Sequence, residues 1–161
     1  MINIFGYGSL INPDSIASTL GRKVITRPAI LEGYYRSWTA SVDIHIHNTI
    51  KKGLFLDLTR AKGAFCNGVL FEVHEHELQY LDCRESGYEK RDIDVDIYEN
   101  NLKAVTYCIP DSNKSSSGVV CTKYKAIVEE GLSRQNKAFK QTYLATTENY
   151  DGEYMKGKYS F

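Results

Sequence analysis

The sequence has no excess of charge of either sign. It contains 20 lysine and arginine residues and 20 aspartate and glutamate residues, so its formal net charge at pH 7 is zero. Proteins that bind nucleic acids or membrane surfaces usually carry a basic excess, because both targets are anionic. The composition therefore supports neither kind of partner, and we expect no nucleic acid and no membrane.

Long apolar runs and paired cysteines are also lacking. No window approaches the roughly 18 apolar residues of a membrane-spanning helix, and the first residues do not have the charged and apolar stretches of a signal peptide. The four cysteines are Cys66, Cys83, Cys108 and Cys121, and none belongs to a C-x-x-C pair. The sequence therefore predicts a cytoplasmic protein with reduced thiols.

Motifs for metals and covalent catalysis are weak. His45 and His47 share a predicted strand face with Asp43, and residues 74–77 read His-Glu-His-Glu, but there is no H-E-x-x-H motif. A polar strand face turned to solvent explains the histidines more simply, so we expect no metal. Cys83 lies near Glu85 but has no recognisable basic partner, which disfavours a thiol nucleophile.

The length and composition fit one globular domain over residues 1–161. Hydrophobic residues make up 42% of the 161 residues, enough for a core in a chain of this size. The twelve tyrosines favour β structure, because tyrosine suits half-buried strands and pockets with polar tips.

Hydrophobic periodicity predicts an α+β domain that is mostly antiparallel. In 91–98, for example, three β-branched residues alternate with three aspartates. Asn12 and Pro13 mark the start of one helix, which Gly21 closes. Strands are expected in 2–5, 24–58, 67–73, 91–98 and 103–109, and helices in 13–20, 74–81, 120–131 and 139–144. Such strands could close into a small barrel, and residues 150–161 have no assignment.

A glycine loop follows the first predicted strand. Tyr7, Gly8, Ser9 and Leu10 lie between that strand and the capped helix, where successive backbone N–H groups can form a cup for a carboxylate or a developing oxyanion. The loop matches neither the G-x-G-x-x-G nor the G-x-x-x-x-G-K-[ST] pattern, so a nucleotide site is not expected. A tight structural turn is the simpler alternative.

Glu85 is a candidate acid/base group. It lies beside a glycine, between the predicted helix 74–81 and the clearest strand, where a carboxylate can reach the edge of a pocket. Burial in an apolar site would raise its pKa toward the range of acid/base catalysis, and Arg84 would oppose this rise if its guanidinium turned inward. Composition alone does not distinguish Glu85 from the other acidic residues.

Loop, strand and glutamate together resemble the gamma-glutamylcyclotransferase-like superfamily. Its members carry a Y-G-S/T-L/N loop, here Tyr7 to Leu10, and a glutamate in a segment beginning L-D-x-x-E, here Leu81 to Tyr88. The stretch Gly68 to Val73 is similar to the family's G-x-hydrophobic-hydrophobic-E/D-V strand. The resemblance covers residues 2–145 and implies a small mixed, mostly antiparallel β-barrel with flanking helices and no cofactor.

The resemblance also implies an activity. Members of the superfamily convert a gamma-glutamyl amine or amide to 5-oxoproline and release the amine, so the implied partner is a small gamma-glutamyl compound. Glu85 matches the family's catalytic glutamate, Tyr7 to Leu10 match its substrate loop, and Tyr124 resembles a tyrosine near its pocket. Helical spacing equally makes Tyr124 a core residue.

Three questions stay open at this point. A binding module that holds a carboxylate ligand without chemistry could use the same loop and pocket. Glutathione, gamma-glutamyl amino acids and gamma-glutamyl-lysine remnants are equally compatible with the sequence, which also leaves the oligomeric state undetermined.

Overall fold

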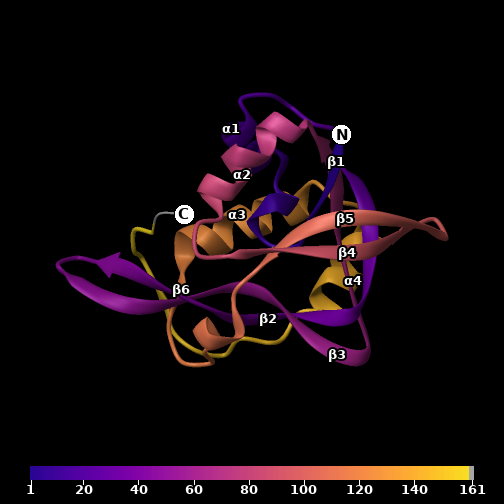
Figure 1. Ribbon diagram of the computed structural model, residues 1–161. Helices are drawn as coiled ribbons and strands as arrows, with labels where there is room; N and C mark the ends of the chain where they lie inside the picture. The colour runs from indigo at the N-terminus through magenta and orange to yellow at the C-terminus, as the bar shows by residue number, and fades with distance from the viewer. Residues whose placement is uncertain (160–161) are drawn as a thin grey trace.

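Five strands of the chain close into a barrel, as a computed structural model of residues 1–159 shows (Figure 1). The order around the barrel is β1-β3-β2-β4-β5. The barrel strands are β1 (Ile2–Gly6), β2 (Arg27–Ile46), β3 (Thr49–Val73), β4 (Glu89–Ile97) and β5 (Asn100–Cys108). All neighbouring strands are antiparallel except β1 and β5, which pair in parallel. The predicted α+β barrel is therefore confirmed.

Four α-helices and a small second sheet surround this barrel in residues 1–159. The helices are α1 (Pro13–Leu20), α2 (Leu78–Arg84), α3 (Thr122–Ser133) and α4 (Lys137–Ala145), and 3₁₀ turns η1 (Ser9–Ile11), η2 (Glu75–Glu77) and η3 (Asp111–Asn113) interrupt the loops. The second sheet pairs β6 (Val120–Cys121) with β7 (Tyr154–Met155). None of these helices is long and apolar enough to cross a membrane.

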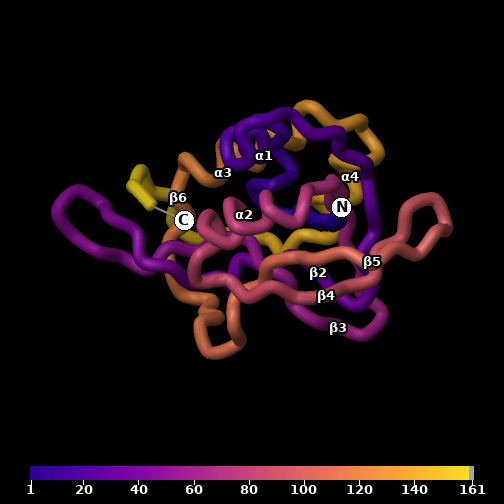
Figure 2. The backbone as a smooth tube through the Cα atoms, turned by 45° about the horizontal axis from the view of Figure 1, so that its top comes forward, coloured from indigo at the N-terminus to yellow at the C-terminus, as the bar shows by residue number. Residues whose placement is uncertain are grey.

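Strands β2 and β3 form one long hairpin that contributes to the barrel and also extends beyond it (Figures 1 and 2). Its register shifts between Glu32 and Tyr34 and between Trp38 and Ala40. Such bulges bend and twist a strand, which helps a sheet close on itself. The strands predicted in 24–58 and in 67–73 are not separated by a loop: β3 is continuous from residue 49 to residue 73, because pairing with β2 carries it through residues 59–66.

Two other boundaries differ from the predictions. Helix α2 reaches Arg84, so the residues just before Glu85 are helical and not part of a loop. Val120 pairs with β7, and α3 therefore begins only at Thr122. These differences depend on contacts between distant parts of the chain, which periodicity does not detect.

A buried arginine ties α4 to the barrel. The side chain of Arg36 on β2 is fully buried, donates to the Tyr143 carbonyl at 3.0 Å and to Thr146 Oγ1 at 2.8 Å, and lies over the Tyr143 ring. The Tyr143 hydroxyl in turn donates to the carbonyl of Tyr7 at 2.6 Å. Helix α4 thereby fixes the backbone of the loop that follows β1.

Candidate active site

A small cavity lies between the loop after β1, the end of α2, strand β5 and helix α3. The space free of protein atoms in and at the mouth of this cavity is about 370 Å³, open solvent included. All six residues that the sequence analysis selected contribute to its lining: Tyr7, Gly8, Ser9, Leu10, Glu85 and Tyr124. Glu85 and Tyr124 follow the loop by about 75 and about 115 residues in the sequence, yet all of them lie at one site. A shared substrate requires this proximity.

The loop changes direction sharply at Gly8. Strand β1 ends at Gly6, and η1 begins at Ser9 with hydrogen bonds from Ile11 N to Gly8 O and from Asn12 N to Ser9 O, both 3.1 Å. The first N–H groups of a helical turn have no partner within that turn and can bind an acceptor from outside. The side chain of Asn12 then accepts from Asp14 N at 3.0 Å and caps α1, so α1 starts directly behind the loop.

Glu85 caps the C-terminus of α2. Its N–H donates to Leu81 O at 2.8 Å, and its carbonyl accepts from Tyr88 N at 2.9 Å. The turn between them contains Gly87 with φ of 97°, a left-handed conformation that favours glycine. This turn ends the helix and directs the chain into β4, with the Glu85 side chain at the cavity.

The Glu85 carboxylate takes up a proton more readily than that of a free glutamate. Its side chain is 12% exposed, and burial raises the pKa of Glu85 above its ordinary value, while the charge and hydrogen bond of Arg84 lower it. Of the residues that line the cavity, Glu85 is the one carboxylic acid, and none is a lysine, arginine or histidine. It is thus the cavity group suited to exchange protons with a ligand.

Four tyrosines also line the cavity. Burial raises the pKa of Tyr7, Tyr88 and Tyr124, and that of Tyr107 is raised by burial and by its bond to Asp82. These phenols therefore stay protonated at neutral pH. Tyr124 lies so close to the loop that a Cβ atom on Gly8 would be 2.7 Å from its hydroxyl oxygen.

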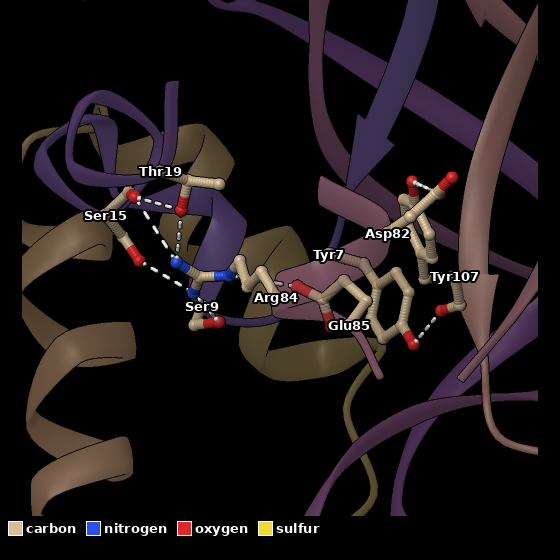
Figure 3. Close-up of polar contacts among 8 residues, drawn as sticks. All are labelled: Tyr7, Ser9, Ser15, Thr19, Asp82, Arg84, Glu85 and Tyr107. Atoms are coloured by element: carbon tan, nitrogen blue, oxygen red, sulfur yellow. Dashed lines mark hydrogen bonds and ion pairs between the residues drawn. The ribbon is translucent and has the colours of Figure 1, made fainter. Parts of the chain in front are cut away.

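Further hydrogen bonds hold the walls of the cavity. The Tyr7 hydroxyl donates to the Tyr107 carbonyl at 2.6 Å, and the Tyr107 hydroxyl donates to Asp82 Oδ1 at 2.7 Å (Figure 3). Sequence reasoning did not select Tyr88 or Tyr107 for the site. Tyr88 ends the motif segment that contains Glu85 and could have been chosen on that ground, whereas nothing local marks Tyr107.

The geometry supports neither the metal site nor the cysteine nucleophile that the sequence analysis considered. His45 and His47 are exposed on the long hairpin. Within residues 1–159, no group of three or more histidine, cysteine, aspartate or glutamate side chains is placed to hold a metal ion. Cys83 is exposed and does not line the cavity.

Comparison with solved structures shows the fold class. The chain superimposes on a gamma-glutamyl cyclotransferase with a TM-score of 0.71 and 18% identity, covering 96% of this chain and 93% of that one. An uncharacterised human protein gives 0.70 at 18% identity, with the same coverage. A yeast gamma-glutamyl cyclotransferase specific to glutathione gives 0.61 at 16% identity, covering 94% and 99%. The chain therefore has the gamma-glutamylcyclotransferase-like fold.

The sequence itself identifies the family. The family model for ChaC-like proteins matches residues 2–149, which is nearly the whole chain. This protein therefore belongs to the ChaC-like family, and the expected resemblance to the gamma-glutamylcyclotransferase-like superfamily is confirmed. No curated protein matches the sequence.

Proposed function

We propose that the protein is a gamma-glutamylcyclotransferase that forms 5-oxoproline from a gamma-glutamyl amine or amide, with Glu85 as general acid/base. The observation that carries this proposal is the position of Glu85. It is a largely buried carboxylate, it is the one carboxylic acid among the cavity residues, and it shares the cavity with the loop Tyr7–Leu10. Family membership and the shared fold support the same reaction class.

The reaction needs proton transfer and a folded substrate, but no nucleophile from the protein. The substrate's α-amine attacks its own γ-carbonyl carbon, which forms the ring C–N bond, and the original amide C–N bond then breaks. Ionised Glu85 accepts a proton from the attacking amine and returns it to the leaving nitrogen, so it ends the cycle ionised. Atoms and charge balance without a cofactor.

The loop has two roles in this mechanism. N–H groups at Gly8, Ser9 and Leu10 bind the substrate carboxylate or the oxyanion of the tetrahedral intermediate, where fixed donors stabilise developing charge. The side chains of Tyr88, Tyr124 and Leu56 also line the cavity and close it around the gamma-glutamyl chain. Holding that flexible chain in its cyclising conformation reduces the entropic part of the barrier.

The test is release of 5-oxoproline from a panel of gamma-glutamyl compounds that includes glutathione, gamma-glutamyl amino acids and gamma-glutamyl-lysine. We expect the wild type to turn over at least one compound, and Glu85→Gln to lower kcat about a thousandfold. Glu89→Gln, a nearby exposed glutamate, is the matched control and should retain full activity.

Binding measurements separate catalysis from simple recognition. Glu85→Gln should still bind the substrate in calorimetry with little change in affinity, because the amide preserves the shape of the side chain. If wild type and Glu85→Gln both bind a gamma-glutamyl compound and neither releases 5-oxoproline, the protein is a carboxylate-binding module and the catalytic proposal fails.

A further inference from the structure

The guanidinium of Arg84 connects the two halves of the cavity. Its Nε donates to Glu85 Oε1 at 3.0 Å, and its Nη2 donates to Ser9 Oγ at 2.9 Å (Figure 3). The remaining contacts anchor it on α1: Nη2 also donates to Ser15 Oγ at 2.9 Å, and Nη1 donates to Ser15 O at 3.3 Å and to Thr19 Oγ1 at 2.8 Å.

These contacts use the full hydrogen-bonding capacity of the side chain. A guanidinium has five N–H donors in one rigid plane, and the five bonds of Arg84 occupy one donor each. No donor remains for a substrate carboxylate. Arg84 does not line the cavity, and its role in the site is therefore exerted through Glu85 and Ser9.

Among the acceptors of these five hydrogen bonds, Glu85 is the one carboxylate. The other four acceptors of Arg84 are neutral oxygens from α1 and the loop. On its outer side, Arg84 shares a shallow hollow with Asp14, Lys123 and Glu130, whereas the ion pair with Glu85 is only 18% and 12% exposed at the two side chains. An ion pair screened this little by water interacts more strongly than a surface pair.

We propose that Arg84 is a positioning residue. It holds the Glu85 carboxylate and the Ser9 hydroxyl at a fixed separation across the cavity, and it supplies a positive charge that favours the ionised form of Glu85, which is the form able to accept a proton. This inference rests on the proposed function of Glu85. It adds that the geometry of the acid/base group is set from α1, by Ser15 and Thr19, and not from the cavity itself.

The groups facing Glu85 make its titration interpretable. Apart from Arg84, they are the phenols of Tyr7, Tyr88, Tyr107 and Tyr124, which lie on four separate segments of the chain. Since burial keeps these phenols protonated, they do not change charge near neutral pH. Asp82, one turn before Glu85, is paired with Lys90 at 2.9 Å, and its pKa is lowered.

Two variants separate the effect of the positive charge of Arg84 from the effect of its planar hydrogen-bonding geometry. Arg84→Met keeps part of the aliphatic stem but removes the charge, so the titration midpoint of Glu85 should rise by about 1 pH unit. Arg84→Lys keeps the charge but not the planar fork. Its midpoint should stay near the wild-type value, while kcat falls about tenfold with little change in KM.

The midpoint is measured directly by carbon-13 NMR of glutamate side-chain carboxyls, with the Glu85 signal assigned by its loss in Glu85→Gln. The acid limb of kcat/KM should move in the same direction as this midpoint. Arg134→Gln is the matched control, since Arg134 also pairs with α1, through Asp14, but its side chain is 40% exposed and its ion pairs are with Asp14 and Glu130 and not with Glu85. It should change neither quantity.

Each outcome decides a separate claim. An unchanged Glu85 midpoint in Arg84→Met, or wild-type kcat in Arg84→Lys, overturns the assignment of Arg84 while the proposed function stands. If Arg84→Met does not fold, Arg84→Lys still tests the positioning role. A wild-type protein that releases no 5-oxoproline overturns the proposed function and this inference together, whatever the NMR titration gives.

Discussion

Gly8 and Tyr124 approach each other so closely that no side chain larger than hydrogen fits between them. A Cβ atom on Gly8 would lie 2.7 Å from the Tyr124 hydroxyl oxygen, well inside normal contact distance. The two residues come from the loop after β1 and from α3, and both line the cavity. Their contact sets the separation of two of its walls.

Gly8→Ala should therefore damage the site more than the fold. The new methyl group displaces either the loop or Tyr124, and we expect 5-oxoproline release to fall at least tenfold. Tyr124→Phe removes the oxygen that the methyl group meets, so the double variant Gly8→Ala/Tyr124→Phe should be more active than Gly8→Ala alone. Additive losses in this double-mutant cycle would show that the contact does not limit the site.

The sequence predicts most of the barrel because local patterns coincide with its long-range contacts. Alternation in β4 is an example: Ile93, Val95 and Ile97 are buried, and Asp92 and Asp94 are exposed. The pattern is less informative in β3. There Leu54, Leu56 and Leu58 are buried as expected, but Phe55 and Asp57 between them are buried too.

Asp57 shows why such positions cannot be predicted locally. Its carboxylate accepts from Lys114 Nζ at 2.7 Å and from Ile109 N at 3.1 Å. Both partners lie more than fifty residues further along the chain, so a sequence window around Asp57 contains no sign of them. The same holds for Arg84, whose orientation toward Ser9 and α1 decides how it acts on Glu85.

The candidate site was predictable as a set of residues but not as a geometry. Local physics indicated that the loop Tyr7–Leu10 could bind an anion, and only the resemblance to a family distinguished Glu85 from the other acidic residues. The structure adds that they line the same cavity. It also adds the supporting bond from Tyr143, a residue that the sequence analysis placed in a helix without a role at the site.

Tyr143→Phe tests that supporting bond. The change removes the hydroxyl that donates to Tyr7 O at 2.6 Å, and a buried carbonyl without a partner costs about 1–2 kcal/mol. We expect that loss in urea denaturation, together with reduced 5-oxoproline release because the loop is less firmly held.

Tyr150→Phe is the control for Tyr143→Phe. The Tyr150 hydroxyl donates to Gly118 O at 3.0 Å and Glu153 O at 2.8 Å, and it does not line the cavity. This variant should lose some stability and keep wild-type activity. Equal activity in both variants would mean that the bond from Tyr143 stabilises the fold without affecting the loop's function.

The pH dependence of activity follows from the raised pKa of Glu85. In the proposed mechanism the ionised carboxylate is the base, so kcat/KM should fall as the pH drops through this pKa, with a midpoint above the value of about 4.3 for an unperturbed glutamate. The substrate amine also titrates and is measured separately on the free compound. After that correction, a midpoint at or below about 4.3 would contradict the burial that the structure gives Glu85.

Glu77 should make stability depend on pH in acid. Its carboxylate accepts from Arg22 Nε and Nη2 and from His74 N, and the bond from Arg22 contributes most to lowering the pKa of Glu77 to about 2. A pKa lower in the folded than in the unfolded protein means that the ionised group stabilises the fold. This stabilisation is complete above the unfolded pKa of about 4.3 and disappears as the pH falls toward about 2.

Glu77→Gln should consequently be less stable than the wild type at pH 7, and the difference should shrink as the pH falls below about 5. Urea denaturation at pH 7, 5, 4 and 3 measures both unfolding free energies. Glu89→Gln, at an exposed position on β4, should differ from the wild type by less than about 0.5 kcal/mol at pH 7. A Glu77→Gln deficit that stays constant from pH 7 to pH 3 would show that the ion pair with Arg22 is not the source of the stabilisation, because a glutamine would then lose only contacts that do not titrate.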